Sequence, residues 1–273
     1  MAGHQGDVRG DEPQKSCHAA DGRRKRVRLR PNTSPTIQGI RRPPAVLLAA
    51  MRHREPHPWH VTAEQAEAIQ RALRQSLPAP RPLGVVRRVA GAAVRGRGDS
   101  LWAAAVVLSL PSLALVDSAV VRARARFSYR PGLMAFRVGP ALLEAFERIK
   151  IRPEVVLFAG HGAAHPRGLG LATHLGALLE TPSAGCADRL LVGSGALPGP
   201  ERGDRTPVLD EEGRPIAAWV RTRPGARPIV VSPGFAITLE EAIGVVLACV
   251  TAYRLLEPLR EARRLAGEVT PAR

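Results

Sequence analysis

The segment that decides the fold reads V-V-L-F-A-G-H-G-A-A-H-P-R-G-L-G-L-A-T-H-L-G and covers Val155–Gly176. It begins with an apolar run, Val155–Phe158, as is typical of a short strand that is covered on both faces. The run ends in Ala159, and a glycine-rich turn that contains His165-Pro166-Arg167 follows. Apolar spacing then predicts a helix over Leu169–Leu179. The segment therefore predicts a buried strand, a loop and a helix of an α/β domain.

Similar patterns predict further elements on both sides of this segment. Short turns join strand-like runs into an antiparallel meander, over Gly84–Val94, Leu101–Leu110 and Ala114–Ala125. Helical spacing predicts helices over Ala63–Gln75, Pro140–Lys150 and Leu239–Tyr253. Strands are also predicted over Ile216–Arg223 and Pro228–Val231, with a strand or bend over Pro182–Val192. This order fits a ribonuclease-H-like α/β domain, a mixed sheet that is flanked by helices.

The length of 273 residues allows one large domain with a tail, or two small domains. Residues 1–57 lack hydrophobic periodicity and are rich in Arg, Gly, Pro and His, so we expect a disordered basic tail there. Its basic run Arg23–Arg30 suits contact with phosphates, although a solvated tail or a misassigned start codon explains it equally well. The domain is expected over 58–266, and a disordered C-terminus over 267–273.

The composition favours nucleic acid as partner. The net charge of +16 is carried almost wholly by arginine and attracts polyanions, although a GC-rich genome is an alternative source of arginine. Cys17, Cys186 and Cys249 are widely spaced, so neither a disulfide framework nor a zinc site is indicated. No apolar run reaches the ~18 residues of a membrane span, and no secretion signal begins the chain. We therefore expect a cytoplasmic monomer without a membrane partner.

Five short segments together resemble the endonuclease V family, repair nucleases that cut beside deoxyinosine. The longest is Tyr129–Pro140, which reads Y-R-P-G-L-M-A-F-R-V-G-P. The others are Gly91–Val94, Ala159–Arg167, Gly185–Asp188 and Ser232–Phe235. The resemblance spans roughly 59–265 and implies the ribonuclease-H-like fold. It also implies Mg²⁺-dependent cleavage of the second phosphodiester bond 3′ to deoxyinosine.

The resemblance also identifies positions at which this chain departs from the family. The acids that hold Mg²⁺ in the family are replaced by Ala93, Val138 and Ala159. A family lysine is replaced by Asp188, and a family histidine by Phe235. Because Mg²⁺ requires oxygen ligands, we expect no metal at the family sites Ala93 and Ala159 and no intact catalytic residue. The sequence predicts a catalytically impaired or inactive member.

Residues that bind the substrate in the family are largely retained. Tyr129 and Pro131 match a wedge loop that separates strands at the lesion, where a tyrosine suits stacking on a base. The pocket for the extruded base is implied at Gly132, Met134, Gly160, Gly170 and Leu171. Phosphate or substrate contacts are implied at His165, Arg167 and Arg137. Each has a structural alternative: a turn glycine, a half-buried tyrosine, a loop cap or a surface charge.

These observations leave three hypotheses. The first is an inactive family member that still binds DNA or RNA containing inosine. The second is an active deoxyinosine endonuclease with displaced ligands, but the acids Asp99, Asp117, Glu144 and Glu147 occupy no motif position. The third is a protein-interaction module without a nucleic-acid role. His174 faces the interior of its helix by spacing and is expected to be structural.

Overall fold

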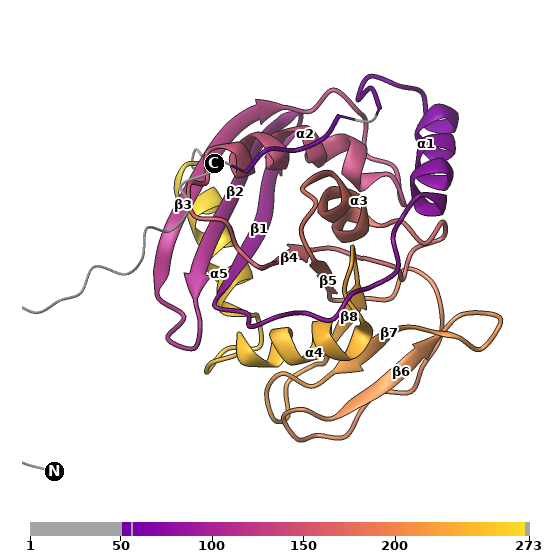
Figure 1. Cartoon of the computed structure of the whole chain (residues 1–273), viewed down its shortest axis with the longest axis vertical. Helices are drawn as coiled ribbons and strands as arrows, with labels where there is room; N and C mark the ends of the chain where they lie inside the picture. Colours follow the sequence, from indigo (N-terminus) through magenta and orange to yellow (C-terminus); the bar gives the residue numbers. More distant parts are fainter. Residues whose placement is uncertain (1–50, 56, 271–273) are drawn as a thin grey trace, which may run out of the picture. The chain divides into compact units, whose positions relative to one another are not determined.

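A computed structural model describes residues 51–55 and 57–270 of the chain (Figure 1). Its centre is an eight-stranded sheet with the strand order β3-β2-β1-β4-β5-β8-β7-β6. The strands are β1 (Arg88–Arg97), β2 (Ser100–Ser109), β3 (Leu115–Arg124), β4 (Val155–Ala159), β5 (Ser183–Ala187), β6 (Arg205–Leu209), β7 (Pro215–Val220) and β8 (Ile229–Pro233). The β1–β4 and β4–β5 pairs are parallel, and the other neighbours are antiparallel. The predicted mixed sheet is confirmed.

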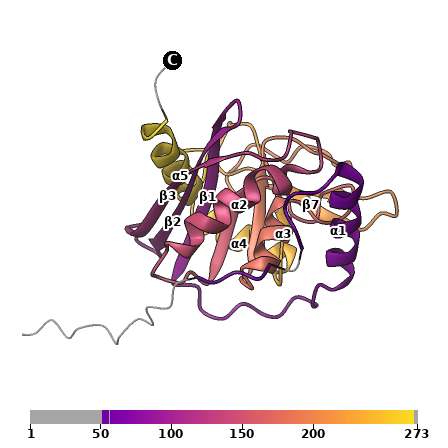
Figure 2. The ribbon, with the colours of Figure 1, turned by 90° about the horizontal axis from the view of Figure 1, so that it is seen from above.

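Helices cover both faces of this sheet (Figures 1 and 2). The helices of the described residues are α1 (Ala63–Gln75), α2 (Met134–Glu147), α3 (Leu171–Leu178), α4 (Leu239–Ala248) and α5 (Glu257–Glu268), of which α1 packs beside the start of α2. Helices α2 and α3 pack on one face, while α4 and α5 pack on the other. In the part of the chain that the structure describes, each helix is too short or too polar to cross a membrane. The ribonuclease-H-like architecture is therefore confirmed.

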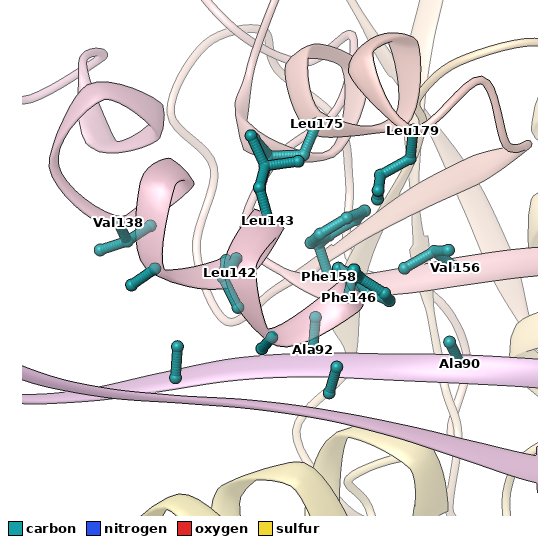
Figure 3. Packing of buried hydrophobic residues seen from close by; sticks show 14 of the residues in the cluster. Ala90, Ala92, Val138, Leu142, Leu143, Phe146, Val156, Phe158, Leu175 and Leu179 are labelled. Carbon is teal, nitrogen blue, oxygen red and sulfur yellow. The ribbon is translucent and has the colours of Figure 1, made fainter. Parts of the chain in front are cut away.

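The alternation of side chains along β1 determines what each face buries. Ala90 and Ala92 face α2 and α3, in a core that includes Phe146 and Phe158 with ring centroids 6.0 Å apart (Figure 3). Ala93 faces the other way and packs beneath α5. Small side chains on β1 let the helices approach closely, and full burial of each phenylalanine contributes about 1.5–3 kcal/mol.

Side-chain caps fix where two of the helices begin. Helix α1 has a capping box in which Thr62 accepts from the Gln65 N–H and Gln65 returns a bond to the Thr62 backbone. Thr238 and Glu241 form the same box at α4. Such caps stabilise a helix by about 1 kcal/mol, and both beginnings coincide with the predicted ones.

Other predicted boundaries are wrong. Helix α2 begins at Met134, not at Pro140, because Ala135, Phe136 and Val138 extend its buried face upstream and the proline lies inside the helix. Strand β1 begins at Arg88 and continues to Arg97, through residues that the sequence suggested as a turn. The predicted long helix ends at Ala248 rather than Tyr253.

Two elements have no counterpart in the prediction. Strand β6 lies at the sheet edge, and most of its residues are exposed or half-buried. It therefore lacks the alternation of apolar and polar residues that predicts a strand. Helix α5 has a polar composition and buries a narrow stripe that includes Leu259, Ala262 and Ala266. It extends to Glu268, two residues into the C-terminal segment 267–273 that was expected to be disordered; residues 271–273 lie outside the described residues.

The expected N-terminal tail over 1–57 is described only in part. Residues 1–50 and 56, and with them the basic run Arg23–Arg30, lie outside the described residues. Met51 is 2% exposed and packs in the core between the sheet and α2–α3. The Arg54 N–H donates to the Leu178 carbonyl at 2.9 Å. Contacts with the domain therefore begin before Trp59, because Met51 supplies an apolar anchor.

Candidate nucleic-acid interface

A small cavity of about 120 Å³ lies among the loop after β3, the start of α2 and the loop after β4. Drug-sized ligands occupy cavities of roughly 300–1,000 Å³, so this volume suits a single flat ring system. The structure brings together most of the residues that the sequence assigned to nucleic-acid binding: Tyr129, Pro131, Gly132, Met134, Gly160, His165, Gly170 and Leu171. It adds residues that the sequence analysis missed: Gln70, Arg130, Ala135, His161 and Leu191.

The carbonyl oxygen of Gly132 organises one wall of this cavity. It accepts hydrogen bonds from Gln70 Nε2 at 3.1 Å, His165 Nε2 at 2.8 Å and Arg167 Nη2 at 3.1 Å. Gly132 has a φ of +76°, and a Cβ at this position would lie 2.8 Å from Arg167 Nη2. Glycine is needed here both for the left-handed backbone and for the approach of the guanidinium group.

His165 is a neutral ring with both nitrogens in use. Burial lowers its pKa from 6.5 to about 4, so the ring is uncharged at neutral pH. Its Nδ1 accepts from the Arg167 N–H at 3.2 Å, and Nε2 therefore carries the proton that is donated to Gly132. The ring connects the loop after β4 to the loop before α2. Its geometry gives it a positioning role in the cavity wall.

Gln70 on α1 is the buried polar residue that sequence reasoning missed. It is 1% exposed, and Nε2 donates to the carbonyls of Gly132 and Leu169 at 3.1 and 3.2 Å. Its Oε1 accepts from Arg167 Nε at 2.6 Å. Both polar atoms of the Gln70 side-chain amide therefore have hydrogen-bond partners. The available signal was its spacing, because Gln70 follows buried Ala66 by one helical turn and is a polar residue on an apolar face.

The glycines of the opposite wall permit close backbone approach. A Cβ on Gly170 would lie 2.4 Å from the His161 carbonyl oxygen, a contact that real side chains do not make. A Cβ on Gly160 would lie 3.2 Å from Leu171 Cδ2, so a side chain there would crowd α3. The Gly170 N–H donates to the Gly162 carbonyl at 2.9 Å. Small residues therefore keep this side of the cavity open to a ligand.

Two large side chains at this cavity are open to solvent. Tyr129 is 63% exposed, and Met134 is 38% exposed. Exposed aromatic rings beside a cavity of this size offer a flat surface on which a base can stack. The structure places Tyr129 at the cavity, and its wedge role stays a prediction.

The positions that the resemblance assigned to the metal ligands of the family, Ala93, Val138 and Ala159, carry apolar side chains. Ala93 is 3% exposed and lies against α5, near Ala262 and Ala266. The register that pairs Ala92 with Phe158 places Ala93 beside Ala159, at the end of β4. Val138 is 9% exposed and belongs to the core beneath α2 and α3 (Figure 3).

These residues do not fit Mg²⁺. The ion binds oxygen ligands in near-octahedral geometry and gives up its water reluctantly, whereas the side chains here carry only methyl groups. Among the described residues, His, Cys, Asp and Glu form no group of three or more that could hold a metal ion. The acids considered as substitutes have other contacts: Asp117 accepts from the Lys150 and Ile151 N–H groups, and Glu144 pairs with Arg148.

Three predicted site residues lie away from the cavity. Arg137 donates to the carbonyls of Phe127 and Gly98 at 2.8 and 2.7 Å, and so connects the β1–β2 turn to the loop before α2. Asp188 pairs with Arg254, with Nη1 and Oδ1 2.9 Å apart. Phe235 lines a separate groove, because β8 runs antiparallel to β5 and carries it toward the start of β5.

His174 is fully buried, as its spacing suggested. Its Nε2 lies 2.7 Å from His57 Nε2, and burial lowers its pKa to about 3. Its ring also stacks on Trp59 with centroids 5.7 Å apart. The residue joins the N-terminal segment to α3 and contributes no group to the cavity.

Comparison with known proteins identifies the family. The Endonuclease V family model matches residues 68–264. Endonuclease V of Roseiflexus sp. (strain RS-1) is 46% identical over 210 residues, which cover 77% of this chain and 94% of the relative. The crystal structure of endonuclease V from Streptomyces avermitilis superposes with a TM-score of 0.72 at 35% identity, covering 81% of this chain and 97% of that one.

A relative has also been solved with nucleic acid. Endonuclease V of Ciona intestinalis, in complex with a 24mer DNA containing an inosine followed by a ribo-adenosine, has a TM-score of 0.65 at 25% identity, covering 75% of this chain and 96% of that one. The fold thus places the chain among ribonuclease-H-like nuclease domains. It belongs to the endonuclease V family, DNA repair nucleases that act on inosine-containing DNA.

Proposed function

We propose that this chain binds deoxyinosine in DNA and does not cleave the strand. The observation that carries the proposal is the contrast within one domain. The cavity residues converge with their hydrogen bonds satisfied, while Ala93 and Val138 pack in apolar clusters and the partly buried Ala159 packs against a third. Binding relies on backbone and ring surfaces that survive the loss of the acids, whereas hydrolysis relies on the acids themselves.

The cavity suits a base that has left the helical stack. An extruded base is held by hydrogen bonds along its edge and by stacking on aromatic or apolar side chains. The glycine walls at Gly160 and Gly170 bring backbone N–H and C=O groups close to the ring. We expect Tyr129, which lines the cavity, to stack in the gap that extrusion leaves. The relative that was solved with inosine-containing DNA supports this choice of ligand.

The side chains of this site offer no ligands for the metal ion that hydrolysis requires. Phosphodiester cleavage of the kind that the family performs requires a metal ion to activate water and to stabilise the leaving oxygen. Transferring an ion into an apolar site without oxygen ligands costs many kcal/mol. We therefore expect binding without product, and the chain would mark or shield a lesion instead of cutting beside it.

A paired binding and cleavage assay tests this function. Duplexes that differ only in one deoxyinosine or deoxyadenosine are incubated with the protein in Mg²⁺ or Mn²⁺, and complexes and products are separated on native and denaturing gels. We expect preferential retention of the deoxyinosine duplex and no product. Incision 3′ to the inosine that EDTA abolishes would refute the proposal.

The two tyrosines of the chain provide a matched pair for the binding arm. Tyr129→Ala removes the exposed ring beside the cavity, and we expect loss of about 1–3 kcal/mol of binding free energy. Tyr253→Ala removes a ring that is 54% exposed and contacts Arg260 instead, and we expect binding to be unchanged. Equal losses in both variants would show that the cavity is not the binding site.

A further inference from the structure

The end of the β1–β2–β3 meander carries arginines in two cross-strand rows. The register aligns Arg95, Trp102 and Arg122 in one row. The next row, two residues further along the strands, contains Arg97, Ser100 and Arg124. Side chains aligned in this way point to the same face of a sheet. The four arginines therefore share one face, and all four are exposed.

Two contacts confirm which face this is. The Arg122 guanidinium carbon lies 5.7 Å from the centroid of the Trp102 ring. A Cβ on Gly267, in the last turn of α5, would lie 3.2 Å from Arg95 Nη1. The arginine face, Arg95, Arg97, Arg122 and Arg124, is thus the face on which α5 packs. Figure 2 shows α5 beside these strands.

Three arginines of this face, Arg95, Arg122 and Arg124, have no acidic partner among the described residues. Asp99, in the adjoining turn, lies 3.6 Å from Arg137. On α5, Glu261 and Glu268 both pair with Arg264. The positive charges of Arg95, Arg122 and Arg124 therefore repel one another, and a polyanion relieves that repulsion.

The position of the arginine face relates it to the site. Ala93 precedes Arg95 by two residues on the same strand and the same face, a separation of about 6.7 Å. From Arg124 the chain continues through exposed Arg126 directly to Tyr129 and the cavity. The face thus adjoins the position of a lost metal ligand on one strand and leads to the base pocket on another.

We propose that the arginine face binds the phosphodiester backbone of the DNA strand whose inosine occupies the cavity. This inference rests on the proposed function and adds where the strand runs. Arginine donates hydrogen bonds in a fork that matches phosphate geometry. The guanidinium groups would supply next to Ala93 the positive charge that the site does not obtain from a metal ion.

Salt dependence of binding tests this surface directly. The neutralised variant is Arg95→Gln/Arg122→Gln/Arg124→Gln. Each lost phosphate contact on a duplex lowers the slope of log K against log salt by about 0.9, so we expect a slope that is smaller by about 2 to 3. Because phosphate contacts carry no sequence information, the affinity ratio between deoxyinosine and deoxyadenosine duplexes should remain that of the parent.

Two matched variants separate contact from net charge. The first is Arg205→Gln/Arg223→Gln/Arg227→Gln, which removes the same charge around β6, β7 and β8, at the opposite end of the sheet. This variant should leave the slope unchanged. A triple lysine variant of Arg95, Arg122 and Arg124 keeps the charge and should retain most of the slope. Should the glutamine triple prove unstable by thermal melting, Arg124→Gln alone is measured, with an expected fall of about 0.9.

The outcomes distinguish this inference from the function on which it rests. Equal slopes for both glutamine triples, with inosine preference intact, would overturn the arginine face and leave the base pocket standing. If the parent protein prefers neither duplex and the slope still falls in the Arg95/Arg122/Arg124 glutamine triple, the proposed function and the assignment to an inosine strand are both overturned. A fall in slope with preference retained supports both.

Discussion

The cavity proposed to hold a base and the positions that the resemblance assigned to metal ligands are built in opposite ways. At the cavity, Gln70, His165 and Arg167 all donate to one carbonyl, that of Gly132. At the metal positions, alanine and valine side chains pack against helices and make no polar contact. A hydrogen-bonded loop has one arrangement that satisfies its donors, whereas an apolar position accepts any small side chain of similar volume. The first region therefore preserves a specific shape, and the second preserves only packing.

The largest effect is expected from introducing acids at the apolar positions of the second region. The triple variant Ala93→Asp/Val138→Glu/Ala159→Asp places two carboxylates in buried sites and one, at the half-buried Ala159, beside them; a buried unpaired acid costs several kcal/mol. We expect its melting temperature in EDTA to fall by about 5 °C or more. Added Mn²⁺ should recover part of that loss by binding to the folded state, and deoxyinosine duplexes should then be cut.

Neutral substitutions provide the control for this experiment. Ala93→Asn/Val138→Gln/Ala159→Asn has nearly the same shape without the charge, and its melting temperature should fall without responding to Mn²⁺. If the acidic triple responds to Mn²⁺ no more than the amide triple, the three positions do not converge on one ion. A melting temperature of the parent that rises with Mn²⁺ would mean that the parent already holds a metal.

A second prediction concerns Gly170, a glycine in the wall of the cavity. In Gly170→Ala the new methyl group would lie 2.4 Å from the His161 carbonyl oxygen, so the backbone of the loop must shift. We expect a lower melting temperature and loss of inosine preference in gel shifts. Gly244→Ala is the matched control, because this exposed α4 glycine has nothing within 4 Å. It should stabilise the protein by up to about 1 kcal/mol and leave binding unchanged.

A third prediction concerns the hydrogen bonds of Gln70. In Gln70→Leu, the Arg167 Nε and the Leu169 carbonyl lose a buried partner. Leaving buried groups unpaired costs roughly 1–3 kcal/mol, which urea denaturation measures, and inosine preference should weaken. Gln75→Leu changes an exposed residue of the same helix and should alter stability by less than about 0.5 kcal/mol. Equal effects in the two variants would argue against a positioning role.

The comparison also explains what the sequence could predict. The cavity residues lie in two continuous motifs, so local pattern sufficed to identify Gly132, Gly160 and Gly170. Gln70 lies about sixty residues before the first motif that it contacts, and only the folded chain brings it to Gly132. The arginine face likewise depends on the register between β1, β2 and β3, which hydrophobic alternation does not specify at an exposed strand end.

Element boundaries failed for a related reason. Apolar spacing indicated a helix from Pro140 onward, but the buried face of α2 extends upstream to Ala135 and Phe136, so the helix begins earlier. Helix α5 escaped prediction because its buried stripe is narrow and its composition polar. Tertiary packing determines both the start of α2 and the position of α5, and a single sequence gives little information on such packing.

A last prediction concerns protonation of His165. Its pKa in the folded protein is about 4, against 6.5 when unfolded. Between those values the unfolded chain binds more protons, so the free energy of unfolding falls as pH decreases and is constant above about pH 7. One such group contributes a slope of at most about 1.4 kcal/mol per pH unit.

His165→Gln tests this contribution, since the glutamine amide retains a donor for the Gly132 carbonyl. Urea denaturation at intervals from about pH 7.5 to about pH 4.5 should give the variant a shallower decline than the parent, by the uptake of one proton. His174 remains and should continue to produce its own decline, because its pKa is also lowered by burial. If the two curves are parallel, burial in the cavity wall does not lower the pKa of His165.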